Sequence, residues 1–134
     1  MSTPTVLVID DLPETGRMIA KYMSRSGITL CTAQTAEEGL ELVRNKAVDA
    51  ILLDIDLGTY QEEGLDILRD LKADRNLKHI PVVMLSVFDT PETKVRAFEL
   101  GAEDYITKPF EPVVLRARME AVLRGVYGNR ALKR

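Results

Sequence analysis

Polar residues that could do chemistry follow directly after four apolar segments of the chain: Asp10, Asp11, Asp54, Ser86 and Lys108. Carboxylates gathered at one place repel each other, so the three aspartates would need a cation among them. Hard oxygen ligands of this kind favour Mg²⁺ or Mn²⁺ over zinc or copper. A lysine opposite the metal suits an anion that contacts both, and phosphate is the obvious anion. A carboxylate beside a phosphate held in this way could be the nucleophile and form an aspartyl phosphate.

Two kinds of segment alternate along the chain and must position these residues. Short apolar segments typical of strands occupy five ranges: 5–9, 28–33, 49–53, 80–85 and 103–107. Amphipathic segments typical of helices begin near five residues: Pro13, Ala36, Leu65, Pro91 and Pro112. The alternation predicts a doubly wound α/β fold, with a five-stranded parallel sheet and five helices on its two faces. Because the carboxyl ends of parallel strands share one edge, the polar residues should converge there in one crevice.

The last two helices contain apolar residues whose direction can be predicted. In the fourth helix we expect Val95 and Phe98 on the core side. In the fifth helix we expect an inward face made of Leu115, Met119, Val122 and Leu123. The tail from Gly125 is expected to fray.

The composition excludes several classes of function. A length of 134 residues fits one domain, and a net charge of −3 argues against binding nucleic acid through the overall field. A single cysteine, Cys31, excludes a disulfide framework, and a single histidine, His79, excludes a metal site with several histidines in one chain. No apolar run reaches about 18 residues, and the N-terminus lacks the basic start of a signal peptide. We therefore expect a cytoplasmic protein without membrane contact.

Four motifs resemble those of the receiver domains of two-component response regulators. In chain order they are Val-Leu-Val-Ile-Asp10-Asp11, Ile-Leu-Leu-Asp54, Val-Met-Leu-Ser86 and Gly-Ala-Glu-Asp-Tyr105-Ile-Thr-Lys108-Pro109-Phe110. The resemblance implies a flavodoxin-like sheet with strand order 2-1-3-4-5. It also implies a receiver domain over residues 1–124, with residues 125–134 as a C-terminal tail or the start of a linker.

The resemblance assigns a role to each polar residue. Asp54 would be the phosphoacceptor, and Mg²⁺ would be held by Asp10, Asp11, Asp54 and the backbone carbonyl of Asp56. Lys108 would contact the phosphoryl group.

The resemblance also implies a switch. Ser86 would contact the phosphoryl group as well, and the rotamer of Tyr105 would report phosphorylation. The peptide bond between Lys108 and Pro109 is expected to be cis.

The implied function is signalling, with a sensor histidine kinase or phosphotransfer protein as phosphodonor and an output domain or effector as the controlled partner. The chain would catalyse only its own phosphotransfer and a slow autodephosphorylation. The fourth helix, fifth strand and fifth helix would form the output face, and we expect at most a weak homodimer there. Asp104 and Arg118 match one salt bridge of such dimers, whereas Lys94 matches half of another and Val114 replaces its acidic partner. Contact with nucleic acid is not expected of this chain.

The sequence departs from the family pattern near the acceptor. The segment between Asp54 and Gly64 lacks the usual proline and is about two residues longer, which predicts a mobile loop. Val87 replaces a usually small residue after the switch hydroxyl, and Phe88 follows it. Phe88 and Asp56 should flank the approach of water to a phosphoryl group on Asp54, and we expect shielding by the phenyl ring to give a long-lived phosphoryl group.

Two alternatives remain open from the sequence. The run Asp54-Ile-Asp56-Leu-Gly58-Thr59 approaches the nucleophile motif of haloacid-dehalogenase-like phosphatases, although Gly58 stands where that motif has threonine or valine. The second alternative is a pseudo-receiver, which keeps the fold without phosphotransfer. Taken singly, the acidic residues could also be helix caps or turn residues, and Lys108 could be a surface lysine.

Overall fold

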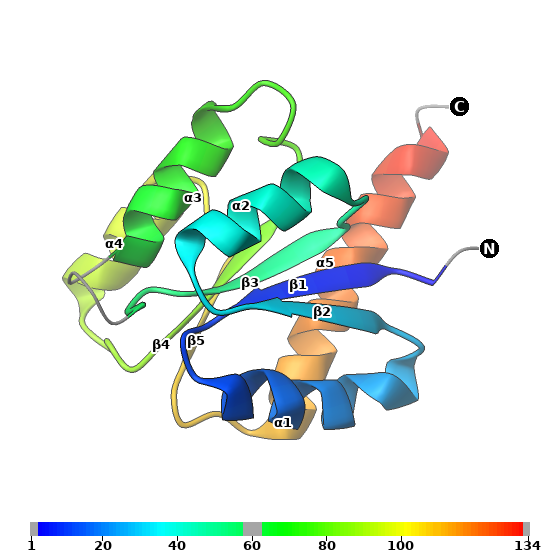
Figure 1. Ribbon diagram of the computed structural model, residues 1–134, viewed down its shortest axis with the longest axis horizontal. Helices are drawn as coiled ribbons and strands as arrows, with labels where there is room; N and C mark the ends of the chain where they lie inside the picture. Colours follow the sequence, from blue (N-terminus) through cyan, green and yellow to red (C-terminus); the bar gives the residue numbers. More distant parts are fainter. Residues whose placement is uncertain (1–2, 58–62, 133–134) are drawn as a thin grey trace.

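The computed structural model describes residues 3–57 and 63–132, with the side chains of residues 127–132 excepted. Its strands are β1 (Thr5–Ile9), β2 (Thr29–Ala33), β3 (Ala50–Asp54), β4 (Val82–Ser86) and β5 (Asp104–Thr107). They form one parallel sheet in the order β2-β1-β3-β4-β5 (Figure 1). The α/β fold with strand order 2-1-3-4-5 is therefore confirmed.

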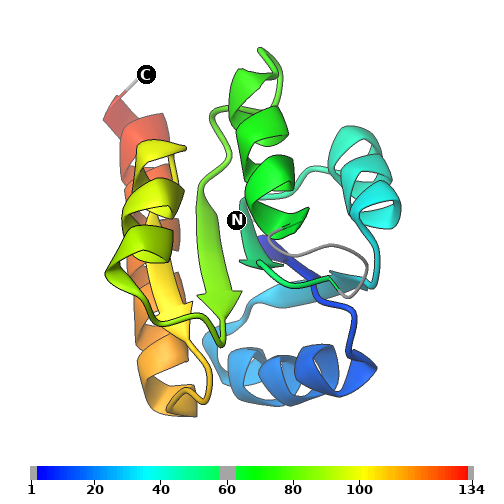
Figure 2. The same ribbon diagram turned by 90° about the vertical axis from the view of Figure 1, so that its left-hand side faces the viewer.

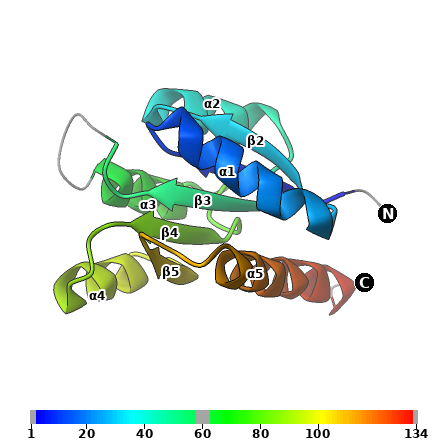
Figure 3. The same cartoon turned by 90° about the horizontal axis from the view of Figure 1, so that it is seen from below.

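Helices connect successive strands: α1 (Pro13–Met23), α2 (Ala36–Asn45), α3 (Glu63–Ala73), α4 (Pro91–Glu99) and, after the last strand, α5 (Pro112–Leu132). A short 3₁₀ turn, η1 (Ser24–Ser26), follows α1. α1 and α5 are neighbours on one face of the sheet (Figure 3), and α2, α3 and α4 contribute to the core on the other. Among the described residues, no helix has the length and apolar character needed to cross a membrane.

The sheet divides the core into two layers because successive strand residues point to opposite faces. In β1, Val6 and Val8 belong to the layer beneath α1 and α5, whereas Leu7 and Ile9 belong to the other layer. All five residues of β3 and of β4 are buried. The continuous apolar runs of these central strands thus reflect burial on both faces, which leaves polar side chains only at the strand ends.

The predicted core face of α4 is wrong. Val95 and Phe98 are 52% and 48% exposed, and the buried residues of α4 are Thr93 and Ala97. Ala97 belongs to the same core cluster as Tyr105 of β5. The helix therefore turns its larger apolar residues to solvent.

The inward face of α5 agrees with expectation, because Leu115, Met119 and Leu123 are buried and Val122 is half-buried against the same cluster. The tail expected to fray from Gly125 is helical as far as Leu132. A glycine inside a helix costs only about 1 kcal/mol relative to alanine, so Gly125 lowers the helical preference without ending the helix.

Candidate functional site

The polar residues singled out in the sequence lie along the carboxyl edge of the sheet, which faces the viewer in Figure 2. Asp10 follows β1, while Asp54 and Ser86 are the last residues of β3 and β4. Lys108 follows β5, and its backbone N–H donates to the carbonyl of Ser86 at 2.7 Å. Parallel pairing of the central strands therefore brings residues far apart in the sequence to one place.

Three carboxylates form the centre of this edge. Oxygens of Asp10, Asp11 and Asp54 lie within 4.8 Å of one another. Asp10 is 3% exposed and Asp54 is 5% exposed, whereas Asp11 is half-buried. Such a set of carboxylate oxygens, open to solvent on one side through Asp11, fits the preference of Mg²⁺ for hard oxygen ligands and retained waters.

Lys108 supplies the positive charge opposite the carboxylates. Its Nζ donates to Oδ2 of Asp10 at 2.9 Å and to Oδ2 of Asp54 at 3.3 Å. Burial alone would lower the pKa of Lys108, but the bonds and charges of the two aspartates outweigh it and raise that pKa. The peptide bond from Lys108 to Pro109 is cis, as the resemblance implies.

The charges at the site are only partly compensated. Burial raises the pKa of Asp54 to about 6, with Asp10 adding to the rise and Lys108 opposing it. The pKa of Asp11 is raised by burial first and by the charge of Asp10 second. A divalent cation would offset the repulsion between the carboxylates and the cost of burying their charge, because it stabilises the ionised form of each carboxylate.

Comparison with known proteins agrees with this geometry. Residues 6–120 match the model of the response regulator receiver domain family. The chain belongs to that family. It is 37% identical over 121 residues to the phosphate regulon transcriptional regulatory protein PhoB of Pseudomonas aeruginosa, covering 90% of this chain and 52% of that protein. It is 36% identical over 124 residues to the cell cycle transcriptional regulator CtrA of Caulobacter vibrioides, covering 92% and 52%.

A solved structure supports the same assignment. The receiver domain of the Francisella response regulator 1452 superposes with a TM-score of 0.82 at 30% identity, covering 91% of this chain and 98% of that one. The receiver chain spans about half the length of the curated relatives it matches.

Ser86 and Tyr105, the two residues to which the resemblance assigns a switch, both form hydrogen bonds with Phe88. Ser86 is fully buried, and its Oγ accepts a hydrogen bond from the Phe88 N–H at 2.9 Å. Tyr105 is 6% exposed, and its hydroxyl donates to the Phe88 carbonyl at 2.6 Å. Phe88 is thus held through both of its peptide groups, a connection that no residue pattern in the sequence revealed.

The structure describes only the two ends of the loop that follows Asp54. The Asp56 N–H donates to Oδ1 of Asp54 at 3.1 Å, and the Asp56 side chain is exposed. The Gly64 N–H donates to the Ile55 carbonyl at 2.7 Å. The prediction of a mobile loop falls on residues 58–62, which lie outside the described part of the chain.

Gly64 is a site residue that sequence reasoning missed. A Cβ atom at this position would lie 2.1 Å from the Asp54 carbonyl oxygen and 2.5 Å from Cα of Ile55. Both are backbone atoms, so no side-chain movement could relieve the clash. Only glycine lets the start of α3 approach the backbone of Asp54 and Ile55 this closely. A glycine that opens an amphipathic helix shortly after Asp54 was the available signal.

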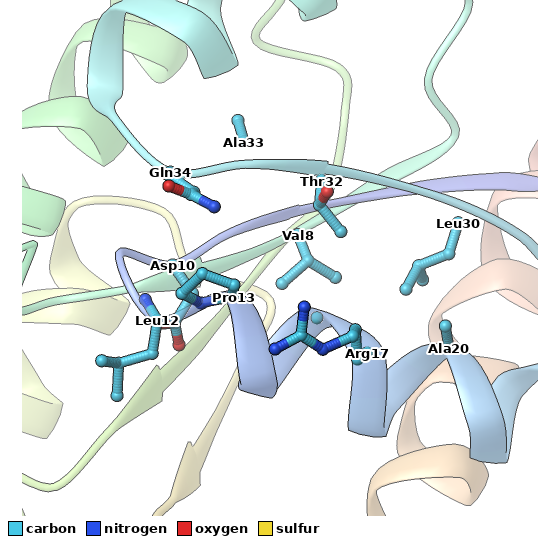
Figure 4. Close-up of a pocket in the computed structure, with 11 residues that line it drawn as sticks. Val8, Asp10, Leu12, Pro13, Arg17, Ala20, Leu30, Thr32, Ala33 and Gln34 are labelled. Atoms are coloured by element: carbon cyan, nitrogen blue, oxygen red, sulfur yellow. The ribbon is translucent and has the colours of Figure 1, made fainter.

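A groove of about 290 Å³ lies beside the carboxylates, between α1 and β2 (Figure 4). Asp10 lines one end of it, and Arg17 and Gln34 supply further polar groups. Its base is apolar, with Val8 and Leu30. Asp54 does not line this groove, so the groove lies beside the three carboxylates and does not enclose Asp54.

Proposed function

We propose that this receiver is a phosphorylation-dependent switch that accepts a phosphoryl group on Asp54. The donor is a sensor histidine kinase or a phosphotransfer protein, which agrees with the family. The observation that carries the proposal is the position of Lys108, whose Nζ bridges Asp10 and Asp54 beside a group of three carboxylates. A cation and an acidic metal set on two sides of one carboxylate suit transfer of an anionic group to that carboxylate.

Each side chain then has a defined task. An oxygen of Asp54 attacks phosphorus while the bond from phosphorus to the donor nitrogen breaks, and the donor imidazole leaves with that electron pair. Asp10, Asp11, Asp54 and the backbone carbonyl of Asp56 would hold Mg²⁺, which supplies charge neutralisation for the phosphoryl oxygens. The Lys108 ammonium holds a phosphoryl oxygen, and the Ser86 hydroxyl donates to another once it leaves the Phe88 N–H.

The output face in this proposal consists of α4, β5 and α5. Its exposed apolar side chains suit contact with a partner: Val95 at 52%, Phe98 at 48% and Val114 at 43% exposure. Ser86 and Tyr105 connect this face to the acceptor through Phe88. The partner is an output domain or a separate effector, because curated relatives are transcriptional regulators about twice as long.

The proposal assigns the receiver unit to residues 1–124 and a tail or linker start to residues 125–134. The unit is expected to act in the cytoplasm, where its kinase donor would present phosphohistidine. Its own chemistry would be limited to accepting the phosphoryl group and losing it slowly to water.

Incubation with acetyl phosphate and Mg²⁺ tests the acceptor. The intact protein should gain the mass of one phosphoryl group, stable in acid and labile in base, and chelation of Mg²⁺ should prevent the gain. Asp54→Asn should abolish labelling, whereas the exposed Asp66 of α3, changed to Asn, is the matched control and should label normally. Equal labelling of Asp54→Asn and wild type would refute the acceptor assignment. Absence of labelling from acetyl phosphate and from a phosphorylated histidine donor alike would favour the pseudo-receiver.

A further inference from the structure

One ammonium on α4 contacts both the loop before that helix and the buried ring of β5. Nζ of Lys94 forms an ion pair with Oδ1 of Asp89 at 2.5 Å. The same Nζ lies 6.0 Å from the centroid of the Tyr105 ring. From the sequence, Lys94 was expected to match half of a salt bridge between two chains. In the structure its ammonium is instead paired with Asp89 of the same chain.

The ion pair sits directly beside the residue that holds Tyr105 inward. Tyr105 donates its hydroxyl to the carbonyl of Phe88, and Asp89 is the next residue along the chain. Fixing Asp89 to α4 therefore restrains the position of the Phe88 carbonyl. If that carbonyl moved, the buried Tyr105 hydroxyl would lose its hydrogen bond to Phe88, which disfavours the buried orientation.

The lysine also acts on the ring itself. A cation within about 6 Å of an aromatic face is attracted by it, and the ring gains this attraction only while it lies beneath Lys94. The carboxylate of Asp89 fixes the ammonium in that position. Both contacts of Lys94 consequently favour the same orientation of Tyr105.

We propose that Asp89 and Lys94 form a latch that holds Tyr105 in its buried orientation and so sets the resting balance of the switch. This inference rests on the proposed function for its meaning, because the balance matters only if Tyr105 reports the state of Asp54. Lys94 is a positioning residue, since it acts through Tyr105 and not on the reacting atoms. The side chains of Lys94 and Asp89 are 40% and 65% exposed, so the latch is a weak one that salt screens. Its loss should change the ratio of buried to exposed Tyr105 roughly two- to five-fold.

The test uses the full chain labelled with 3-fluorotyrosine and kept unphosphorylated. Tyr105→Phe identifies the ¹⁹F resonance of Tyr105, and its solvent isotope shift between H₂O and D₂O measures exposure of the ring. Lys94→Met keeps the aliphatic stem and removes the charge, and it should increase the isotope shift. Lys94→Arg should restore the wild-type value. High salt should raise the isotope shift of wild type but leave that of Lys94→Met unchanged.

The matched control is Arg69→Met, which removes an exposed ion pair with Asp66 on α3 at 3.4 Å and leaves Asp89, Lys94 and Tyr105 unchanged. It should leave the Tyr105 resonance unaltered. The latch is refuted if Lys94→Met shows the wild-type isotope shift, or if Arg69→Met changes it as much.

A second arm adds beryllofluoride with Mg²⁺ as a phosphoryl analogue and separates the two proposals. A change of the Tyr105 resonance in wild type supports coupling to Asp54, and the same starting population and the same change in Lys94→Met would contradict control by the latch. If beryllofluoride changes Tyr105 in no variant, the proposed coupling fails, while the unphosphorylated arm still decides whether the latch exists.

Discussion

Lys108 lies between two buried carboxylates, and its ammonium is the group through which the last strand would sense a phosphoryl group. Lys108→Ala removes this charge, so we expect phosphorylation of Asp54 from acetyl phosphate to slow by on the order of tenfold or more, since a hydrogen bond to a charged group is worth about 1.5–3 kcal/mol. Quenched-flow or mass-spectrometric labelling rates measure the effect. Lys78→Ala, on the exposed loop before β4, is the control. A full conformational response in Lys108→Ala would contradict the role.

Phe88 should shield a phosphoryl group on Asp54 from attack by water. Its side chain is half-buried against the core layer of α2, α3 and α4 and has no hydrogen-bonding group to offer an attacking water. Phe88→Ala should shorten the lifetime of the phosphoryl group several-fold, a barrier change on the order of 1 kcal/mol. The loss of phosphate from purified phosphoprotein measures this lifetime.

Two variants make that measurement specific. The neighbouring Val87 is 62% exposed, and Val87→Ala should leave the lifetime unaltered. Asp56→Asn tests the opposing influence of a carboxylate, which could orient water but also repels the phosphoryl oxygens. An unchanged half-life in Phe88→Ala would mean that the ring does not guard the phosphoryl group.

Among the elements, α4 has the most unusual surface, because Val95 and Phe98 face solvent. Two cations of the proposed face are already paired within the chain: Arg118 with Asp104 at 3.5 Å and Lys94 with Asp89. Self-association through this face would therefore depend mainly on apolar contact.

We expect a weak dimer through α4, β5 and α5 that phosphorylation strengthens. Phe98→Asp should abolish the increase on phosphorylation, measured by sedimentation velocity, because a charge would be buried in the contact. Met18→Asp, at a 42% exposed apolar residue of α1, is the control on another surface. Solution scattering that shows a tight dimer through a different face would contradict this prediction.

The sequence predicted the elements and the gathering of the acidic residues because these depend on strong local signals. An uninterrupted apolar run such as Ile51, Leu52 and Leu53 avoids contact with water only in a strand that is buried on both faces of the sheet. The polar residue that follows such a run therefore lies at the end of the strand. The face of α4 was not predictable in the same way. The buried residues of α4 are Thr93 and Ala97, and how the helix is rotated against the sheet depends on tertiary packing that helical periodicity does not include.

The connections through Phe88 and Gly64 were harder to predict from the sequence. They involve backbone atoms, whose partners depend on how loops cross in space. No side-chain type marks the connection through Phe88, and at Gly64 the only signal was a glycine at the start of an amphipathic helix.

For the whole molecule, the site is a source of instability as well as of function. The pKa of Asp54 is about 6 in the folded chain against 3.8 as the ordinary value, so the folded state binds its proton more tightly than the unfolded state does. Stability from this group is therefore lost as the pH rises from about 4 to about 6, and it stays lost at higher pH.

Asp54→Asn should consequently stabilise the metal-free protein at pH 7.5, by on the order of 1–2 kcal/mol after allowance for partial contact with solvent. An asparagine oxygen can still accept from Lys108. The gain should shrink as the pH falls from about 6 and approach zero only below about pH 3, where the wild-type carboxyl is protonated in both states. Urea unfolding with a chelator measures the difference, with Asp66→Asn as control. Mg²⁺ should stabilise wild type more than Asp54→Asn. A less stable Asp54→Asn at pH 7.5 would contradict the assignment.

The close approach of Gly64 to the Asp54 carbonyl has a consequence for how the protein tolerates genetic change. In a saturation library selected for signalling, Gly64 would be depleted of every substitution, as Asp54 would be, although it has no side chain to do chemistry. Gly125 of α5 would accept many replacements, because a Cβ there meets nothing within 4 Å. Constraint at a glycine in this fold would thus mark the path of the backbone next to Asp54, and selection data alone would mistake it for a reacting residue.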